Sequence, residues 1–144
     1  MSALPAAPAE PETSGLREHL GIRFVGMEGE SVVLELCMGP QHLNLASTLH
    51  GGAIATLIDI ACALAARTPP GPPNADAMAS PGPYRGVATL SLALHFTRPV
   101  REGRVRAVGR RMAGGRRVVF ASADVFDDKG RLVANGSGSF AVMG

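Results

Sequence analysis

A single carboxylate stands inside the most apolar segment of this 144-residue chain. The segment covers residues 51–66, and Asp59 is its only acidic residue. An ionised carboxylate in an apolar setting is costly unless it is paired or hydrogen-bonded, and a carboxylate held out of water is a stronger base. Asp59 is therefore a candidate general base or nucleophile. The alternative is a core aspartate satisfied by a neighbouring hydroxyl, such as that of Thr56.

His50, Gly51 and Gly52 stand at the beginning of the same segment. The N-terminus of a helix offers unpaired N–H groups and a partial positive charge, and two glycines let a ligand approach the backbone closely. We therefore expect a place where a developing oxyanion can be held. The alternative is that the two glycines only begin a tightly packed helix.

The distance between these two features has a consequence for assembly. Asp59 follows His50 by nine residues, a rise of roughly 13–14 Å along a helix. The two side chains therefore cannot act on one bond within a single chain. If both do act on one bond, the carboxylate comes from a second copy, and an isologous dimer supplies two such composite sites.

Hydrophobic periodicity predicts the elements that position these residues. Apolar residues at helical spacing predict a helix over 51–67, apolar nearly all round and therefore wrapped by other structure. A short helix is expected to be capped by Ser14 and to end at Leu20. Alternating patterns predict strands over 22–27, 31–38, 87–97, 103–112, 116–127 and 132–142. This order indicates an α+β fold in which a curved antiparallel sheet wraps around the long central helix.

The strand predicted over 87–97 has two distinct faces. One face would carry Leu90, Leu92, Leu94 and Phe96, and the other would carry Thr89, Ser91, Ala93 and His95. Two-residue alternation is the basis of this assignment.

Length and composition fit one domain over residues 14–144, preceded by a disordered tail over 1–13. That tail does not have the pattern of a signal peptide, and the longest apolar run is too short to span a bilayer. Cys37 and Cys62 are expected to be reduced core thiols of a cytoplasmic protein. The four histidines show no metal-ligand spacing. The proline-rich segment 68–83 is expected to be either a functional loop, such as a lid, or disordered.

Positive charge is concentrated in one part of the chain. Eight of the 14 Lys and Arg residues lie between Arg98 and Arg117, and all eight are arginine. They form either the solvated faces of two strands or a site for phosphate, which arginine recognises well. The net charge of +2 is too small to indicate a nucleic-acid partner or an anionic membrane surface.

Asn44, His50-Gly51-Gly52 and Asp59 resemble the Asn-x5-His-Gly-Gly-x6-Asp signature of hotdog-fold acyl-CoA thioesterases, with the phenylacetic-acid-degradation type as the closest branch. The resemblance covers roughly residues 15–142. It departs from the signature at Ser47, where the family usually has glycine.

The resemblance implies hydrolysis of an acyl-CoA thioester, with no cofactor apart from the coenzyme A of the substrate. The N–H of Gly51 would polarise the thioester carbonyl. Asp59 from the partner subunit would act as base or nucleophile, while Asn44 and His50 would orient the thioester or the attacking water. A hydroxyl that places this water is best matched by Thr89, and Ser91 is the alternative.

The resemblance also implies contacts to the rest of the substrate and an assembly. Gly52 would lie against the substrate at the start of the helix. Arg116 and Arg117 would contact the phosphates of coenzyme A, with Arg98 and Arg85 as weaker candidates. Two sheets would join edge to edge into a homodimer, and two dimers would pair into a tetramer.

Other readings of the chain remain. A hotdog hydratase or dehydratase would need a different motif around the helix, and a non-catalytic acyl-CoA binding module would have no need of Asp59. A serine-nucleophile triad is not expected because no Gly-x-Ser-x-Gly elbow is present. Nucleic-acid binding is not expected because no aromatic residues accompany the arginines.

Overall fold

The computed structural model describes residues 15–67 and 86–143. Within these residues, six strands form one antiparallel sheet in the order β1-β2-β4-β5-β6-β3. The strands are β1 (Ile22–Glu28), β2 (Ser31–Cys37), β3 (Val87–Phe96), β4 (Arg104–Gly114), β5 (Val118–Phe126) and β6 (Leu132–Val142). The helices are α1 (Gly15–Leu20), the short 3₁₀ helix η1 (Pro40–His42) and α2 (Gly51–Arg67).

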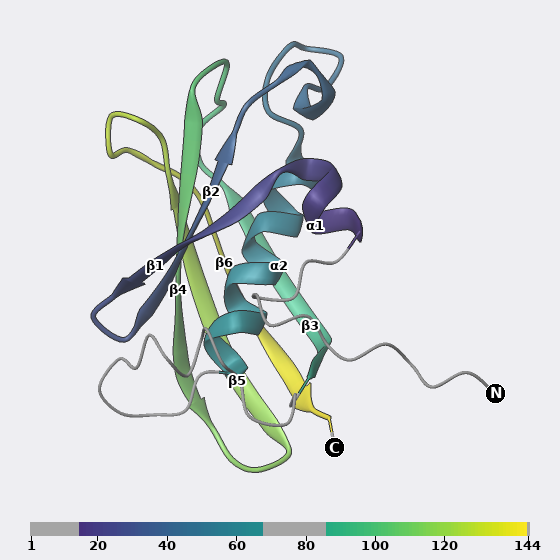
Figure 1. The fold of residues 1–144 in the computed structure, drawn as a ribbon, viewed down its shortest axis with the longest axis vertical. Coiled ribbons are helices and arrows are strands. Elements are labelled where there is room, and N and C mark those ends of the chain that lie inside the picture. Colours follow the sequence, from purple (N-terminus) through teal and green to yellow (C-terminus); the bar gives the residue numbers. More distant parts are fainter. Residues whose placement is uncertain (1–14, 68–85, 144) are drawn as a thin grey trace, which may run out of the picture.

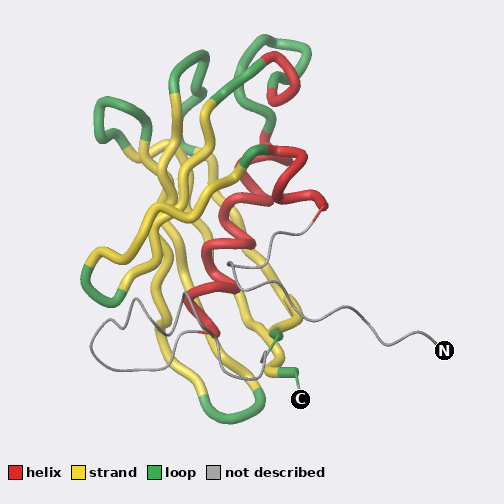
Figure 2. The backbone as a smooth tube through the Cα atoms, in the orientation of Figure 1, coloured by secondary structure: helices red, strands yellow, loops and turns green. Residues whose placement is uncertain are grey.

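The sheet curves around α2, which lies along its inner face (Figures 1 and 2). The predicted α+β architecture is therefore confirmed. The helix over 51–67 and the last strand have their predicted bounds, and the other strands differ by one or two residues at their ends. The predicted cap at Ser14, the tail over 1–13 and the segment 68–83 lie outside the described residues.

One side of α2 packs directly onto the sheet. A Cβ atom on Gly109 of β4 would lie 2.6 Å from the carbonyl oxygen of Ala61, so only glycine allows the helix backbone to come this close. The side chains that α2 buries are small or aliphatic: Ala53, Ile54, Leu57, Ile58, Ala61, Cys62, Ala65 and Ala66. Among the described residues, Phe140 is the only aromatic side chain that is fully buried. Because the core is aliphatic, small side chains and glycines fix the height of α2 above the sheet.

The opposite side of α2 is only half-buried. Thr56, Asp59, Ile60 and Ala63 form a stripe there at helical spacing, and each is partly accessible. The prediction that α2 is wrapped all round is therefore wrong for the described residues, because the sheet covers one side only. Asp59 lies on this accessible stripe rather than in the core.

The two cysteines have different environments. Cys62 is buried on the sheet side of α2, while Cys37 is exposed at the end of β2. Both are free thiols. The prediction of a core position is confirmed for Cys62 and wrong for Cys37, because the side chain of Cys37 lies on the outward face of a strand whose inward positions are buried.

Strand β3 forms one edge of the sheet. It is hydrogen-bonded to β6 on one side, and its other side has no strand partner among the described residues. Leu90 and Phe96 are 59% and 53% exposed. An uncovered edge with exposed apolar side chains is a natural place for another strand to pair.

Candidate active site

In the first turn of α2, one backbone donor has no partner among the described residues. The N–H of Gly52 donates to Nδ1 of His50 at 2.8 Å, and the N–H groups of Ala53 and Ile54 donate to the His50 carbonyl oxygen at 2.9 and 3.2 Å. Within the described part of the chain, the N–H of Gly51 has no acceptor. Because Nδ1 of His50 accepts a hydrogen bond, the neutral ring carries its proton on Nε2. The helix start thus offers two donors, the Gly51 N–H and the exposed His50 Nε2–H.

The free N–H belongs to a residue that lines a cavity of about 360 Å³. A Cβ on Gly51 would lie 3.7 Å from the ring of Phe96, so this ring covers the glycine. Other residues of the lining are Thr48, Leu49, Ile54, Thr97, Arg98, Pro99 and Val100. The lining is mainly apolar, and Arg98 brings a positive charge to it.

The loop before α2 is closed by Asn44. Its Oδ1 accepts hydrogen bonds from the N–H groups of Ala46 and Thr48 at 3.0 and 3.1 Å, and its Nδ2 donates to Oγ1 of Thr48 at 2.9 Å. Ser47, in the same loop, has a φ of 58°, a left-handed conformation that favours glycine. This conformation explains why the resembled signature carries glycine at that position. The structure uses the Asn44 amide to shape the loop that leads to His50.

Asp59 lies in the middle of α2 and is paired with β3. Thr89 Oγ1 donates a hydrogen bond to Asp59 Oδ1 at 2.7 Å. Thr56 donates instead to the carbonyl oxygen of Gly52 at 2.9 Å, so it does not satisfy the carboxylate. Burial raises the pKa of the neighbouring Cys62 thiol to about 12, and the negative charge of Asp59 adds to this rise. Cys62 therefore stays a neutral thiol beside the carboxylate.

A bulge in β3 places the hydroxyl of Thr89, and not that of Ser91, next to Asp59. Thr89 pairs with Phe140 and Ser91 pairs with Ser139, so Leu90 is the extra residue. The hydroxyl of Ser91 is hydrogen-bonded to that of Ser139 at 2.6 Å, away from Asp59. The prediction that Thr89 and Ser91 share a face is wrong, because the bulge reverses the alternation between them.

The predicted site residues along α2 and β3 form two separate groups within one chain. Asp59 and Thr89 make one group, and His50, Gly51 and Gly52 make the other. No hydrogen bond among the described residues joins the two groups. Asp59 follows Gly51 by eight positions along the helix, a rise of about 12 Å. Within one chain the two groups are thus kept apart.

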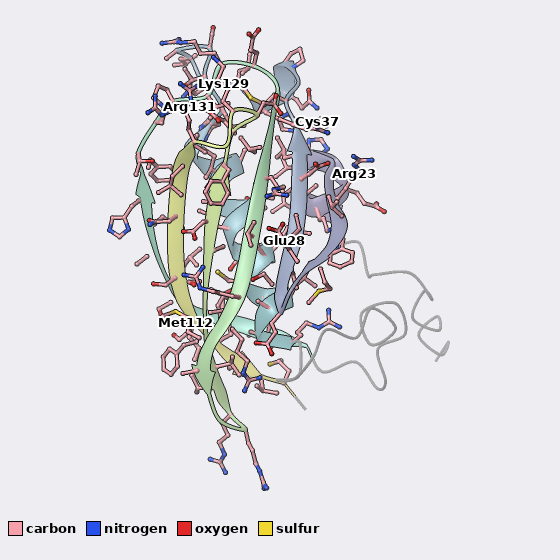
Figure 3. The ribbon with its side chains drawn as sticks, turned by 90° about the vertical axis from the view of Figure 1, so that its left-hand side faces the viewer. Arg23, Glu28, Cys37, Met112, Lys129 and Arg131 are labelled. Atoms are coloured by element: carbon pink, nitrogen blue, oxygen red, sulfur yellow. The ribbon has the colours of Figure 1, made fainter. Side chains whose placement is uncertain are left out.

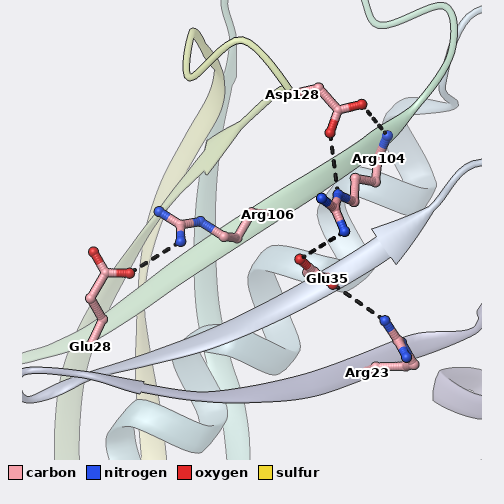
Figure 4. Close-up of polar contacts among 6 residues, drawn as sticks. All are labelled: Arg23, Glu28, Glu35, Arg104, Arg106 and Asp128. Carbon is pink, nitrogen blue, oxygen red and sulfur yellow. Dashed lines mark hydrogen bonds and ion pairs between the residues drawn. The ribbon is translucent and has the colours of Figure 1, made fainter.

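Three arginines of the basic segment are held in ion pairs on the outer face of the sheet. Figure 3 views this face and labels Glu28, one of the carboxylates involved. Arg104 of β4 lies between two carboxylates, with Nε 3.3 Å from Asp128 and Nη1 3.7 Å from Glu35 (Figure 4). Arg106 pairs with Glu28 at 3.3 Å, and Arg110 pairs with Asp124 at 3.3 Å. These three arginines match the interpretation as solvated strand faces.

The arginines predicted to bind phosphate have no carboxylate partner within the described residues. Arg116 and Arg117 are exposed in the β4–β5 turn. Val118, which follows this turn, pairs with Ala141, and Ala141 pairs with Ala88 near the start of β3. Gly51 instead lies beside Phe96, the last residue of β3. The turn and the start of α2 therefore lie at opposite ends of the sheet (Figure 1). Arg98 lies at the same end as Gly51, and Arg85 is outside the described residues.

His42 is a structural feature that the sequence analysis did not single out. Its side chain is buried, and both ring nitrogens are hydrogen-bonded. The one feature of the sequence that could have drawn attention to His42 is its position two residues before Asn44. In the described ranges no group of three or more His, Cys, Asp or Glu residues could hold a metal ion. None of the described helices has the length and apolarity needed to cross a membrane.

Comparison with known families identifies the class of protein. The profile of the thioesterase superfamily matches residues 46–134, which include most of the loop before α2, the whole of that helix and strands β3 to β5. This is more than half of the chain, and the chain belongs to the thioesterase superfamily. Hydrolysis of an acyl thioester is accordingly its general activity. None of the curated proteins matches the chain.

Solved structures show the same fold over nearly the whole chain. A conserved protein of Pseudomonas aeruginosa is 28% identical, with a TM-score of 0.74 over 91% of this chain and 95% of the other. A mutant of the phenylacetic acid degradation protein PaaI of Thermus thermophilus is 26% identical, with a TM-score of 0.70 over 90% and 100%. A thioesterase of Haemophilus influenzae is 20% identical, with a TM-score of 0.74 over 89% and 82%, and supports the fold alone.

Proposed function

We propose that this protein is an acyl-CoA thioesterase of the phenylacetic-acid-degradation type, with an active site shared between two copies of the chain. The observation that carries the proposal is the separation of two groups of site residues beside a strand edge that has no strand partner among the described residues. Asp59 bonded to Thr89 lies beside this edge, and the unpaired Gly51 N–H lies about 12 Å of helix rise away. A second copy paired along β3 would supply the half that each site lacks.

The register of β3 supports this arrangement. If two β3 strands pair antiparallel along their full length, Val87 of one copy lies opposite Phe96 of the other, and Thr89 lies opposite Leu94. Leu94 is two residues from Phe96, about 7 Å along a strand, and the Phe96 ring lies beside Gly51. Asp59 of one copy then approaches the helix start of the other. A two-fold axis creates two such sites.

The chemistry follows from the groups that meet. The Gly51 N–H and the positive end of α2 stabilise the oxyanion that forms when the thioester carbonyl is attacked. The His50 Nε2–H is a second donor for the thioester. Asp59 either takes a proton from the attacking water or attacks the carbonyl itself, and Thr89 holds the carboxylate in place. The C–S bond breaks, and the products are the free acid and the coenzyme A thiol.

Antiparallel pairing also brings positive charge to the shared site. Because it reverses the ends of the sheet, Arg116 and Arg117 of one copy lie at the same end as Arg98 of the other. Coenzyme A carries a 3′-phosphate and a diphosphate, which arginine binds through paired N–H groups. These three arginines lack carboxylate partners within the described residues, so they remain available for the nucleotide.

The direct test is release of thiol from a panel of acyl-CoA substrates. We expect Asp59→Asn to lower kcat by about 10²–10⁴-fold, the usual contribution of a general base, with the oligomer intact. Asp124→Asn is the matched control because it removes a carboxylate from the outer face and should leave kcat unchanged. If the protein binds acyl-CoA but releases thiol from none of the substrates, the proposed thioesterase activity is contradicted, and a non-catalytic acyl-CoA binding module is favoured.

Subunit mixing tests the shared site. Chains with Asp59→Asn and chains with His50→Ala are each expected to be inactive. After exchange, half of the dimers would contain one chain of each kind, and one of their two sites would be intact. Mixing should therefore restore about a quarter of the wild-type activity. No gain after mass spectrometry has confirmed exchange would place both groups within one chain and overturn the geometry.

A further inference from the structure

The ring of His42 joins two segments that are far apart in the sequence. Its Nε2–H donates to the carbonyl oxygen of Leu20 at 2.7 Å, and its Nδ1 accepts the N–H of Gly39 at 2.9 Å. The residue is only 2% exposed. The two bonds together require the neutral ring with its proton on Nε2. His42 thus links the α1–β1 connection to the beginning of η1.

The main chain of His42 continues this link to His50. The His42 N–H donates to the carbonyl oxygen of Gly39 at 3.0 Å, and its carbonyl oxygen accepts the His50 N–H at 2.7 Å. Immediately beyond His42, Leu43 and Leu49 form a β-bridge that closes the loop containing Asn44. Asn44 therefore stabilises the loop by hydrogen bonds within it, and His42 connects the loop to Leu20 and Gly39 outside it.

We propose that His42 is a positioning residue for thioester hydrolysis, acting through His50 and the first turn of α2. This inference rests on the proposed function. His50 is exposed, and the side-chain bond that the described residues give it is the one to the Gly52 N–H. Its place is consequently set by its backbone, which the His42 carbonyl holds. Catalytic groups need supporting contacts of this kind, since a shift of about 1 Å costs up to 10²-fold in rate.

Two substitutions separate hydrogen bonding from volume. His42→Leu fills the space without either bond, whereas His42→Gln keeps one acceptor and one donor at the end of the side chain. We expect His42→Leu to lower kcat by about 10- to 100-fold with little change in KM, and His42→Gln to recover most of the loss. His19→Gln, at an exposed histidine of α1, is the control and should behave as wild type.

A spectroscopic measurement distinguishes positioning from a loss of stability. The ¹⁵N shifts of the His50 ring and the amide signal of Gly52 report their mutual hydrogen bond. In folded His42→Leu protein we expect both signals to move, and in His42→Gln to return toward wild type. If His42→Leu does not fold, His42→Asn, which is too short to reach Leu20, is measured in the same way and should move both signals.

The possible outcomes separate this proposal from the proposed function. Wild-type His50 and Gly52 signals in the folded substituted protein, together with kcat within two-fold of wild type, would overturn the positioning role. If the wild-type protein hydrolyses no acyl-CoA, the proposed function fails. The two NMR signals then decide alone whether His42 sets the geometry of the helix start.

Discussion

The polar groups on the two faces of the sheet differ in how fully they are paired. On the outer face, ion pairs join Arg23, Glu35, Arg104 and Asp128 into one chain, and Arg106 and Glu28 form a separate pair (Figure 4). Residues of both groups line a hollow of about 590 Å³, larger than the cavity beside Gly51. On the helix side, polar groups are few. There the Gly51 N–H has no acceptor among the described residues, and Asp59 has one hydroxyl donor.

The two faces therefore differ in how many of their polar groups already have a partner, and not only in the number of charges or the size of a hollow. A charge that already has its partner would have to give it up before binding a ligand, and exposed pairs of this kind add little stability. A free donor at a helix N-terminus can act on a ligand without breaking an existing bond. We therefore place catalysis on the helix side of the sheet, where the polar groups are few.

Replacing Gly51 is the strongest test of this contrast. Gly51→Pro removes the single N–H that we expect to bind the oxyanion, and proline is well tolerated at the first position of a helix. We expect kcat to fall by about 10²–10³-fold, the usual effect of losing one oxyanion donor, with little change in the melting temperature. The measurement is steady-state thiol release together with thermal unfolding.

Gly51→Ala is the matched control, because it adds a side chain and keeps the N–H. Its Cβ would lie 3.7 Å from the Phe96 ring, an ordinary contact. We expect its kcat to stay within a few-fold of wild type. Equal losses in the alanine and proline variants would show that space around Gly51, and not the donor, determines the rate.

The arginines offer a second way to sharpen the comparison. Arg116→Ala and Arg117→Ala should raise KM for acyl-CoA about 3- to 10-fold with kcat unchanged, because they remove binding that the ground state and transition state share. Arg104→Ala should leave both constants unchanged and lower the free energy of unfolding by less than ~1 kcal/mol, since the arginine side chain is largely exposed and exposed ion pairs add little stability. An increase in KM in the Arg104 variant alone would move the nucleotide to the outer face.

Most of the fold was predictable because it depends on local patterns. The apolar run over 51–67 contains no proline, and its helix has the expected bounds. The β5–β6 turn at Asp128-Lys129-Gly130 and the strand after it follow from the same kind of signal. The same local patterns predicted that the two glycines lie at the start of α2.

Long-range pairing limited the prediction of the site. Arg104 meets Glu35 and Asp128 only because β2 and β5 happen to flank β4, and one sequence does not reveal that order. The choice between Thr89 and Ser91 depended on a bulge that strand periodicity cannot indicate. His42 was missed because its partner Leu20 is 22 residues away.

The stability contributed by the β5–β6 turn, which lies outside the proposed active site, is expected to depend on pH. The Asp127 carboxylate accepts the N–H groups of Lys129 and Arg131 and the Nε–H of Arg131 at 2.8–2.9 Å. The backbone hydrogen bond from Arg131 is the main reason that the pKa of Asp127 is lowered. The stabilisation is therefore complete above the unfolded pKa of about 3.9. It is lost as the pH falls through the lower pKa of the folded state.

Asp127→Ala should accordingly lower the melting temperature by a few degrees at pH 7, and the difference from wild type should shrink as the pH approaches about 2. Thermal unfolding followed by circular dichroism across this range is the measurement. Glu30→Ala, in the β1–β2 turn, controls for the loss of one acidic residue. A difference that stays constant with pH would show that turn geometry, and not the ionised carboxylate, is responsible.

The smallest effect is expected at Ser47, where the loop before α2 departs from the family signature. Its φ of 58° costs a non-glycine residue about 1–2 kcal/mol, and glycine avoids this cost but loses more freedom on folding. Ser47→Gly should therefore raise the free energy of unfolding by at most ~1 kcal/mol, whereas Ser47→Ala should give no gain. Because the loop keeps its shape through Asn44 and His42, kcat should stay the same. A stabilised Ser47→Gly variant with lower kcat would instead show that the strained serine adjusts the position of His50, and the loop would then contribute to catalysis as well as to structure.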